Sequence, residues 1–217
     1  MQGAAIQLQK DNIKRSILDR SKDEFFRNGF AEAKIRDIAS ACGISVGNIY
    51  NYFQGKNGIF HEIVSSTIAE IDRILDENDR MDYFALPESW GYEYHMAFVE
   101  EVARFIERHR ENLKLIVFHS HGSDLEDYAS RVIDRYTESM IRFLQRMKEK
   151  FQDNGVSVSE FFIHNLASFY INTVEELLMH DVQDEEMVRY LRELMEFTYQ
   201  GWRPLMNWYT FLPWTVE

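Results

Sequence analysis

The sequence is poor in the residues that interrupt regular structure. Its 217 residues include one cysteine, three prolines and ten glycines. The single cysteine, Cys42, excludes an internal disulfide and a cysteine-based zinc site, and it fits a reducing compartment. So few prolines and glycines exclude the many turns of a β-sandwich, and no strand-like alternation is evident. The scarcity of breakers predicts long helices and an all-α fold.

Long apolar runs are also missing. No purely apolar run in the interior is longer than that of Leu115–Phe118, and the first twenty residues hold no stretch typical of a signal sequence. We therefore expect a cytoplasmic protein without a membrane-spanning segment. Hydrophobic residues nevertheless make up 45% of the chain and aromatic residues 14%, which is enough for a substantial core.

Positive charge is scarce overall but is unevenly distributed. The formal net charge is −12. Residues 1–56 contain nine Lys and Arg against six Asp and Glu, a net charge of +3, whereas residues 57–217 carry a net charge of −15. A small basic head on an acidic body keeps an attractive field for polyanions local to one end. The change of sign supports a division into domains at 1–56 and 57–217.

Apolar residues recur at three- and four-residue steps, which is the period of an amphipathic helix. The spacing predicts helices over residues 8–28, 57–79, 93–110, 113–119, 124–152, 157–180 and 184–202. Gly29 is expected to end the first of these, with Phe30 folding back as a hydrophobic anchor.

Residues 35–53 have the pattern of a helix-turn-helix unit. Ala39 is small enough for two helices to cross closely, Gly43 opens the turn, and Ile49 fills the gap between the helices. Ser45 is the expected N-cap of the second helix, which we expect over residues 46–52. On this spacing alone an ordinary αα-corner remains the alternative.

The wider context resembles the N-terminal domain of the TetR family of transcriptional regulators. The resemblance covers about residues 10–65 and is carried by Asn28-Gly29-Phe30, Ile35–Ala39, Gly43–Phe53 and Lys56, with a similar Gly201–Pro204 near the end of the last predicted helix. It implies a homodimer with two DNA-reading heads on an all-helical body that binds a small molecule. Members of the family usually have Thr where this chain has Ala33, which puts that capping and phosphate contact in doubt.

The second helix of the unit is expected to enter the major groove with its N-terminal residues toward the bases. Asn51 could read a base edge, the tyrosine hydroxyls would reach phosphates, and Lys56 would meet a phosphate at a helix N-terminus. The predicted DNA-binding residues are Lys34, Arg36, Ser45, Val46, Gly47, Asn48, Tyr50, Asn51, Tyr52 and Lys56.

The body is richer in aromatic residues than a core requires, so some of them are candidates to line an apolar effector cavity between helices. The candidate effector residues are Trp90, Tyr94, His95, Phe98, Phe118, Tyr136, Asn165, Phe169 and Asn172. The acidic balance of the body disfavours an acidic effector. The last two helices are apolar on more than one side and so predict a four-helix dimer interface. Its candidate residues are Phe162, Leu166, Phe169, Leu177, Tyr190, Leu191, Leu194 and Thr198.

The first interpretation is therefore a ligand-responsive, dimeric transcriptional regulator, a repressor, that binds double-stranded operator DNA and is not an enzyme. It requires no cofactor or metal. Two alternatives remain open: an all-α metal-dependent enzyme and a helical interaction module without DNA binding. The pairs Glu160/His164 and Glu176/His180 have a spacing that could chelate a metal, but the Glu-x-x-His repeat of a di-iron bundle is absent.

Overall fold

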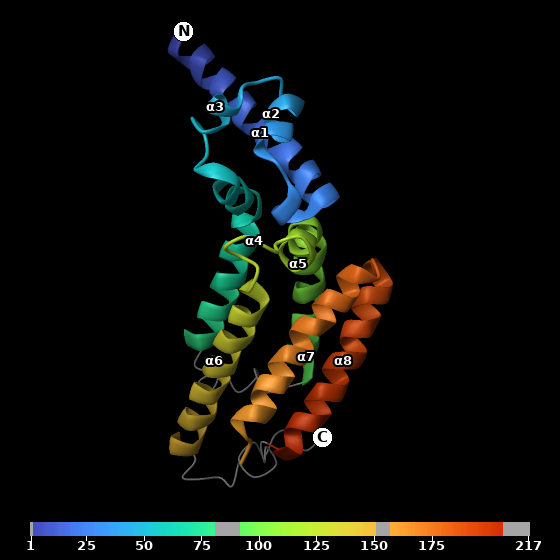
Figure 1. Cartoon of the computed structure of the whole chain (residues 1–217). Helices are drawn as coiled ribbons and strands as arrows, with labels where there is room; N and C mark the ends of the chain where they lie inside the picture. The colour runs from blue at the N-terminus through green and yellow to red at the C-terminus, as the bar shows by residue number, and fades with distance from the viewer. Residues whose placement is uncertain (1, 81–91, 151–156, 206–217) are drawn as a thin grey trace. The chain divides into compact units, whose positions relative to one another are not determined.

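The computed structural model describes residues 2–80, 92–150 and 157–205, and these ranges contain helices and no strand (Figure 1). The predicted all-α fold is confirmed. The helices are α1 (Gln2–Glu32), α2 (Ile35–Ala41), α3 (Val46–Ile49), α4 (Gly55–Arg80), α5 (Tyr92–Phe118), α6 (Tyr128–Lys150), α7 (Glu160–Met179) and α8 (Asp184–Leu205). No helix in the described ranges combines the length and the apolar character that a membrane span needs.

Several of the predicted helix bounds differ from the structure. Helix α1 begins at Gln2 rather than at residue 8, and α6 begins at Tyr128 rather than at residue 124. The expected break between residues 110 and 113 does not occur, and α5 is continuous from Tyr92 to Phe118. The polar residues there do not end the helix; they bond to other helices, Glu111 to Lys22 and Asn112 to the carbonyl of Ile63. In the helix-turn-helix unit, α3 ends at Ile49 rather than at residue 52, because the next turn tightens to i to i+3 hydrogen bonds.

The chain divides into two compact units. The first comprises residues 1–71 with 111–128, and the second comprises residues 72–110 with 129–217. This division differs from the predicted boundary after residue 56, because the apolar stripe at the start of α4 is buried in the first unit. Both α4 and α5 contribute residues to each unit.

Three phenylalanines form the centre of the first unit. The Phe25 ring meets Phe60 edge-on at 5.1 Å between centroids and stacks on Phe30 at 5.7 Å. The chain reaches this arrangement because Gly29 takes φ 71° and ψ 166°, which interrupts α1 and turns Phe30 back into the core. Both the predicted break and the predicted anchor are confirmed.

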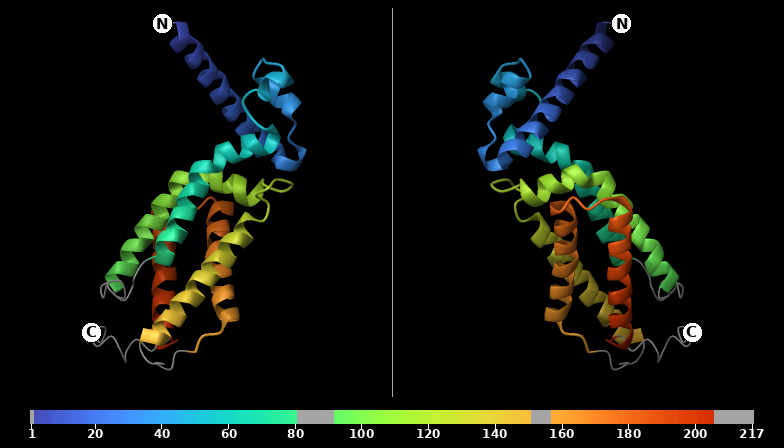
Figure 2. Two further views of the ribbon diagram at one scale, coloured as in Figure 1. Left: turned by 90° about the vertical axis from the view of Figure 1, so that its left-hand side faces the viewer. Right: turned by 90° about the vertical axis from the view of Figure 1, so that its right-hand side faces the viewer.

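The second unit is a bundle in which α7 and α8 run side by side (Figures 1 and 2). The Ser159 hydroxyl accepts a hydrogen bond from the backbone N–H of Phe162 and so caps α7. The fully buried side chains here include Ile106, Met147, Ile163, Leu178 and Met187.

Candidate nucleic-acid interface

Helices α2 and α3 form the helix-turn-helix unit that the sequence predicts. Ile38, Ala39 and Ile49 are buried, and Ile49 has no exposed surface at all. Gly43 takes φ 66° in the turn, where no side chain would meet a neighbour. The Ile44 N–H closes this turn with a hydrogen bond to the Ala39 carbonyl at 3.0 Å. The three spacing residues therefore have the packing and turn roles assigned to them.

Ser45 caps α3 as predicted. Its hydroxyl accepts a hydrogen bond from the Asn48 N–H at 3.2 Å, and its backbone is extended at φ −75° and ψ 153°. The cap supplies one of the acceptors that the first turn of a helix lacks. A helix as short as α3 depends on such a cap and on its buried Ile49 to keep its orientation.

Four residues of α3 and of the turn after it are exposed to solvent. Tyr50 is 56% exposed and Val46 38% exposed, and Gly47 and Asn51 are exposed as well. The Asn51 amide donates to the side-chain oxygen of Asn48 at 3.4 Å, which orients two hydrogen-bonding groups along one edge. Apolar and amide groups on a ridge with a glycine in it can approach base edges closely.

The residues that flank α3 differ in their exposure to solvent. Lys34 and Arg36 are exposed, and Lys34 occupies the N-cap position of α2 without a side-chain capping bond. Tyr52 is half-buried beside the exposed Tyr50. Ala33 is buried, so the departure from the family pattern at this position places a methyl group in the packing of the turn.

Lys56 lies in a different environment from the one expected for a phosphate contact. Its Nζ donates hydrogen bonds to the carbonyls of Phe30, Ala31 and Ala33. It also lies 4.4 Å from the centroid of the Phe30 ring. Burial lowers the pKa of the Lys56 ammonium below its ordinary value, and the nearby Glu32 carboxylate acts in the opposite direction.

The helix-turn-helix unit is similar in sequence to known regulatory proteins. Residues 17–63 match the family model described as "Bacterial regulatory proteins, tetR family". These residues, which span the helix-turn-helix unit, are therefore similar to the N-terminal part of TetR-family regulators. A relative over most of the chain is an uncharacterised helix-turn-helix-type transcriptional regulator of Bacillus subtilis (strain 168), YfiR. It is 21% identical over 187 residues, which cover 82% of this chain and 83% of that protein.

Solved structures with the same fold extend the likeness beyond the TetR-type domain. One is a Clostridium perfringens protein assigned to the regulation of fatty acid metabolism, with a TM-score of 0.58 and 16% identity over 86% of this chain and 97% of that chain. Another is the Bacillus subtilis regulator FadR in complex with stearoyl-CoA, with a TM-score of 0.57 and 16% identity over 86% and 98% of the two chains. At these identities the likeness concerns the fold.

The predicted effector residues differ in exposure and in the unit to which they belong. Trp90 lies outside the described residues, and Phe118 belongs to the first unit whereas the others belong to the second. The exposed members are Tyr94, Phe98, Phe118, Asn165, Phe169 and Asn172. The Asn165 amide donates to the Phe161 carbonyl of its own helix. His95 and Tyr136 are half-buried and contact the rings of Tyr199 and Tyr170.

The predicted dimer residues fall into two groups. Phe162, Phe169 and Tyr190 present 42%, 41% and 38% of their surface to solvent, and Leu166 and Leu194 are half-buried. The other three are buried within the chain itself, which leaves less of their surface open to a partner. These are Leu177, Leu191 and Thr198. Sequence reasoning also missed Phe197, which is 74% exposed on α8.

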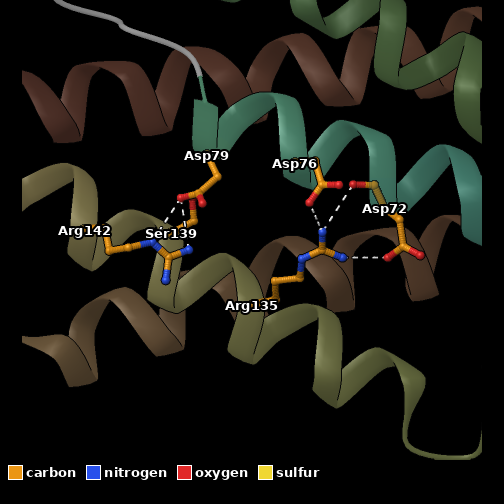
Figure 3. A network of polar contacts seen from close by, with 6 residues as sticks. All are labelled: Asp72, Asp76, Asp79, Arg135, Ser139 and Arg142. Carbon is orange, nitrogen blue, oxygen red and sulfur yellow. Dashed lines mark hydrogen bonds and ion pairs between the residues drawn. The ribbon is translucent and has the colours of Figure 1, made fainter.

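A buried hydroxyl and a polar network escaped the sequence analysis. Burial raises the pKa of the Tyr170 hydroxyl, while its hydrogen bonds to Thr198 and Trp202 act against that rise. Figure 3 shows the network, in which arginines of α6 bond carboxylates of α4. Among the described residues no group of three or more potential metal ligands comes together.

Proposed function

We propose that the protein is a dimeric, ligand-responsive transcriptional repressor that binds operator DNA through α2 and α3. The observation that carries this proposal is the exposed ridge of α3 on a TetR-type domain whose buried Ile49 and capping Ser45 fix its orientation. Val46, Gly47 and Asn51 face the bases in this interpretation, and the Tyr50 hydroxyl bonds a phosphate. Lys34 and Arg36 add backbone contacts.

The charge distribution supports DNA as the partner. Residues 1–56 carry a net charge of +3 and the remainder a net charge of −15. Duplex DNA attracts the basic end and repels the acidic remainder, which orients the encounter.

An exposed apolar face on α7 and α8 supports a homodimer. Phe161 is 77% exposed and Phe197 is 74% exposed, and Phe162 and Phe169 recur seven residues apart on one face of α7. Large aromatic side chains exposed on neighbouring helices are typical of an interaction surface. Two α7–α8 pairs related by a two-fold axis would cover this face and supply the second recognition head.

The second unit supports an effector of apolar character. Tyr170 contacts the rings of Tyr136 and Phe169, with centroids 6.3 and 6.1 Å apart, and Phe162 meets Trp202 at 6.0 Å. Both solved structures described above are named for fatty acid regulation or an acyl-CoA complex. A long acyl chain is therefore the first effector class to test. Helix α4 begins in the first unit and ends in the second, so its displacement by an effector would change DNA affinity, with a coupling of about 1–3 kcal/mol.

Selection from a random DNA library tests the proposal directly. The full-length protein should enrich a sequence with two related half-sites about one helical turn apart. Binding of that DNA is then followed by fluorescence anisotropy with stearoyl-CoA, stearate and a neutral stearoyl ester added in turn. Enrichment of no sequence would overturn the regulator assignment, and unchanged affinity with the whole panel would overturn an acyl effector.

A further inference from the structure

The end of α1 leaves backbone carbonyls that no helical N–H can reach. The last carbonyls of any helix lack partners within it. Gly29 interrupts α1 with a positive φ of 71°, shortly before the helix ends at Glu32. The carbonyls of Phe30, Ala31 and Ala33 are thereby gathered on one side of the turn. Lys56 of α4 donates to all three, at 3.0 Å to both Ala31 and Ala33.

This arrangement uses the full donor capacity of Lys56. An ammonium group has three N–H donors and no acceptor, and each carbonyl takes one of them. The Phe30 ring lies 4.4 Å from the same nitrogen and belongs to the aromatic centre formed with Phe25 and Phe60. A contact with a DNA phosphate would require the ammonium to leave these four partners.

Side chains of the turn offer no substitute for the lysine. Ala31 and Ala33 have only methyl groups, and Lys34 makes no side-chain cap at the start of α2. Backbone bonds hold the remaining groups: the Phe30 N–H donates to the His119 carbonyl at 2.8 Å and the Ala33 N–H to the Gly29 carbonyl at 3.1 Å. Lys56 therefore ties the entry of α2 to the start of α4.

We propose that Lys56 is a positioning residue for DNA binding, which sets the α1–α2 turn and with it α2 and α3, and that it does not itself bind a phosphate. This inference rests on the proposed function and replaces the phosphate contact expected from the sequence. A residue that positions the reading helix changes affinity without changing the number of phosphates neutralised. A residue that binds a phosphate changes both.

The test compares Lys56→Met and Lys56→Arg with Lys34→Met, an exposed lysine on the same unit. Operator affinity is measured by anisotropy across a range of salt concentrations, with the active fraction fixed by stoichiometric titration. Lys34→Met should lower the salt slope by about 0.9, the contribution of one phosphate. Lys56→Met should raise Kd about tenfold, which corresponds to the net loss of one or two hydrogen bonds, with an unchanged slope.

Lys56→Arg separates positioning from charge. The planar guanidinium keeps the positive charge but cannot direct three donors at convergent carbonyls, so this variant should bind as weakly as Lys56→Met. Simple loss of folded protein would lower the active fraction and leave the Kd of the remaining active protein unchanged. Amide hydrogen exchange without DNA should increase over residues 29–38 in both Lys56 variants and stay unchanged in Lys34→Met.

The outcomes distinguish this role from the proposed function. A salt slope reduced by one phosphate in Lys56→Met, wild-type affinity in Lys56→Arg, or unchanged hydrogen exchange over residues 29–38 would overturn the positioning role alone. Failure of the wild-type protein to bind any selected DNA would overturn the proposed function and the positioning role together.

Discussion

Arg135 of α6 donates a hydrogen bond to the Asp72 carboxylate of α4, with 2.6 Å between Nη1 and Oδ1, and its other terminal nitrogen bonds Asp76 one turn further along α4 (Figure 3). Arg142, two turns further along α6, donates to Asp79 through Nε at 3.1 Å and Nη2 at 3.0 Å. Seven-residue spacing on both helices places these groups on matching faces. The acidic end of α4 thus forms an ionic ladder with α6.

A double-mutant cycle on Arg135 and Asp72 should give a small coupling energy. Both side chains are partly exposed, at 38% and 48%, so solvent screens the pair. We expect about 0.2–1 kcal/mol for Arg135→Gln with Asp72→Asn, measured by urea unfolding, and a smaller value in high salt. Arg73→Gln is the control, because Arg73 pairs with Glu77 within α4 and should show no coupling to Asp72. A coupling that high salt leaves intact would contradict the interpretation.

Asp79 should make stability depend on pH in the acid range. The hydrogen bond from Arg142 holds the pKa of the Asp79 carboxyl below its ordinary value, burial opposes this, and a hydrogen bond from Ser139 adds to it. Because the folded pKa lies below the unfolded one, the carboxylate stabilises the fold above the unfolded pKa. This contribution is lost as pH falls through the folded pKa. The wild type should therefore have a higher free energy of unfolding than Asp79→Asn at about pH 6. This difference should shrink as the pH falls to about 3.

Arg142→Gln checks the cause of that pH dependence. Without the guanidinium, the pKa of Asp79 should rise toward its ordinary value, as followed by the carboxyl carbon shift in an NMR titration. A pKa that stays in place in this variant would assign the effect to Ser139 instead.

The helix-turn-helix unit could be predicted from the sequence because its determinants are local. Ala39, Gly43, Ser45 and Ile49 lie within eleven residues, and each acts through the backbone or through its nearest neighbours. The ionic ladder could not be predicted, because Arg135 and Asp72 are 63 residues apart and meet only once the register of α4 and α6 is set. Periodicity identifies the apolar stripe of each helix but not its partner.

The same limit applies to the predicted interface and DNA-contact residues. Leu177 and Leu191 belong to helices with two apolar sides, and the pattern does not say which side faces the chain itself. The structure buries these two and exposes Phe197. For Lys56, proximity to a helix N-terminus suggested a phosphate, whereas the carbonyls that bind it come from residues 23 to 26 positions earlier.

Removal of the two phenylalanines that are most exposed among the described residues should dissociate the proposed dimer. Phe161→Ser with Phe197→Ser removes apolar surface twice in a two-fold interface, which should raise the dimer dissociation constant by about a hundredfold or more. Analytical ultracentrifugation measures this shift, and operator affinity should fall with it. Leu8→Ser is the matched control, since Leu8 is 63% exposed on α1 and should leave the mass unchanged. An unchanged mass in the double variant would place the interface elsewhere.

Alanine at Gly43 and at Gly47 should affect stability with opposite signs. Gly43 has φ 66° with nothing within 4 Å of an added methyl group, so its replacement costs about 1–2 kcal/mol of backbone strain and lowers the melting temperature. Gly47 lies in α3, and the nearest atom to an added methyl group is Ser45 Oγ at 4.0 Å. Gly47→Ala should therefore raise stability, by up to about 1 kcal/mol.

The same two variants should weaken DNA binding for different reasons. Gly47 is exposed on the α3 ridge, so a methyl group there comes between the backbone and the base edges and raises the Kd of a more stable protein. Gly43→Ala acts through the turn, and its loss of affinity should diminish at lower temperature, where the native turn is more populated. Thermal unfolding and anisotropy on each variant separate the two effects. A Gly47→Ala protein with wild-type operator affinity would show that this face of α3 does not approach the bases.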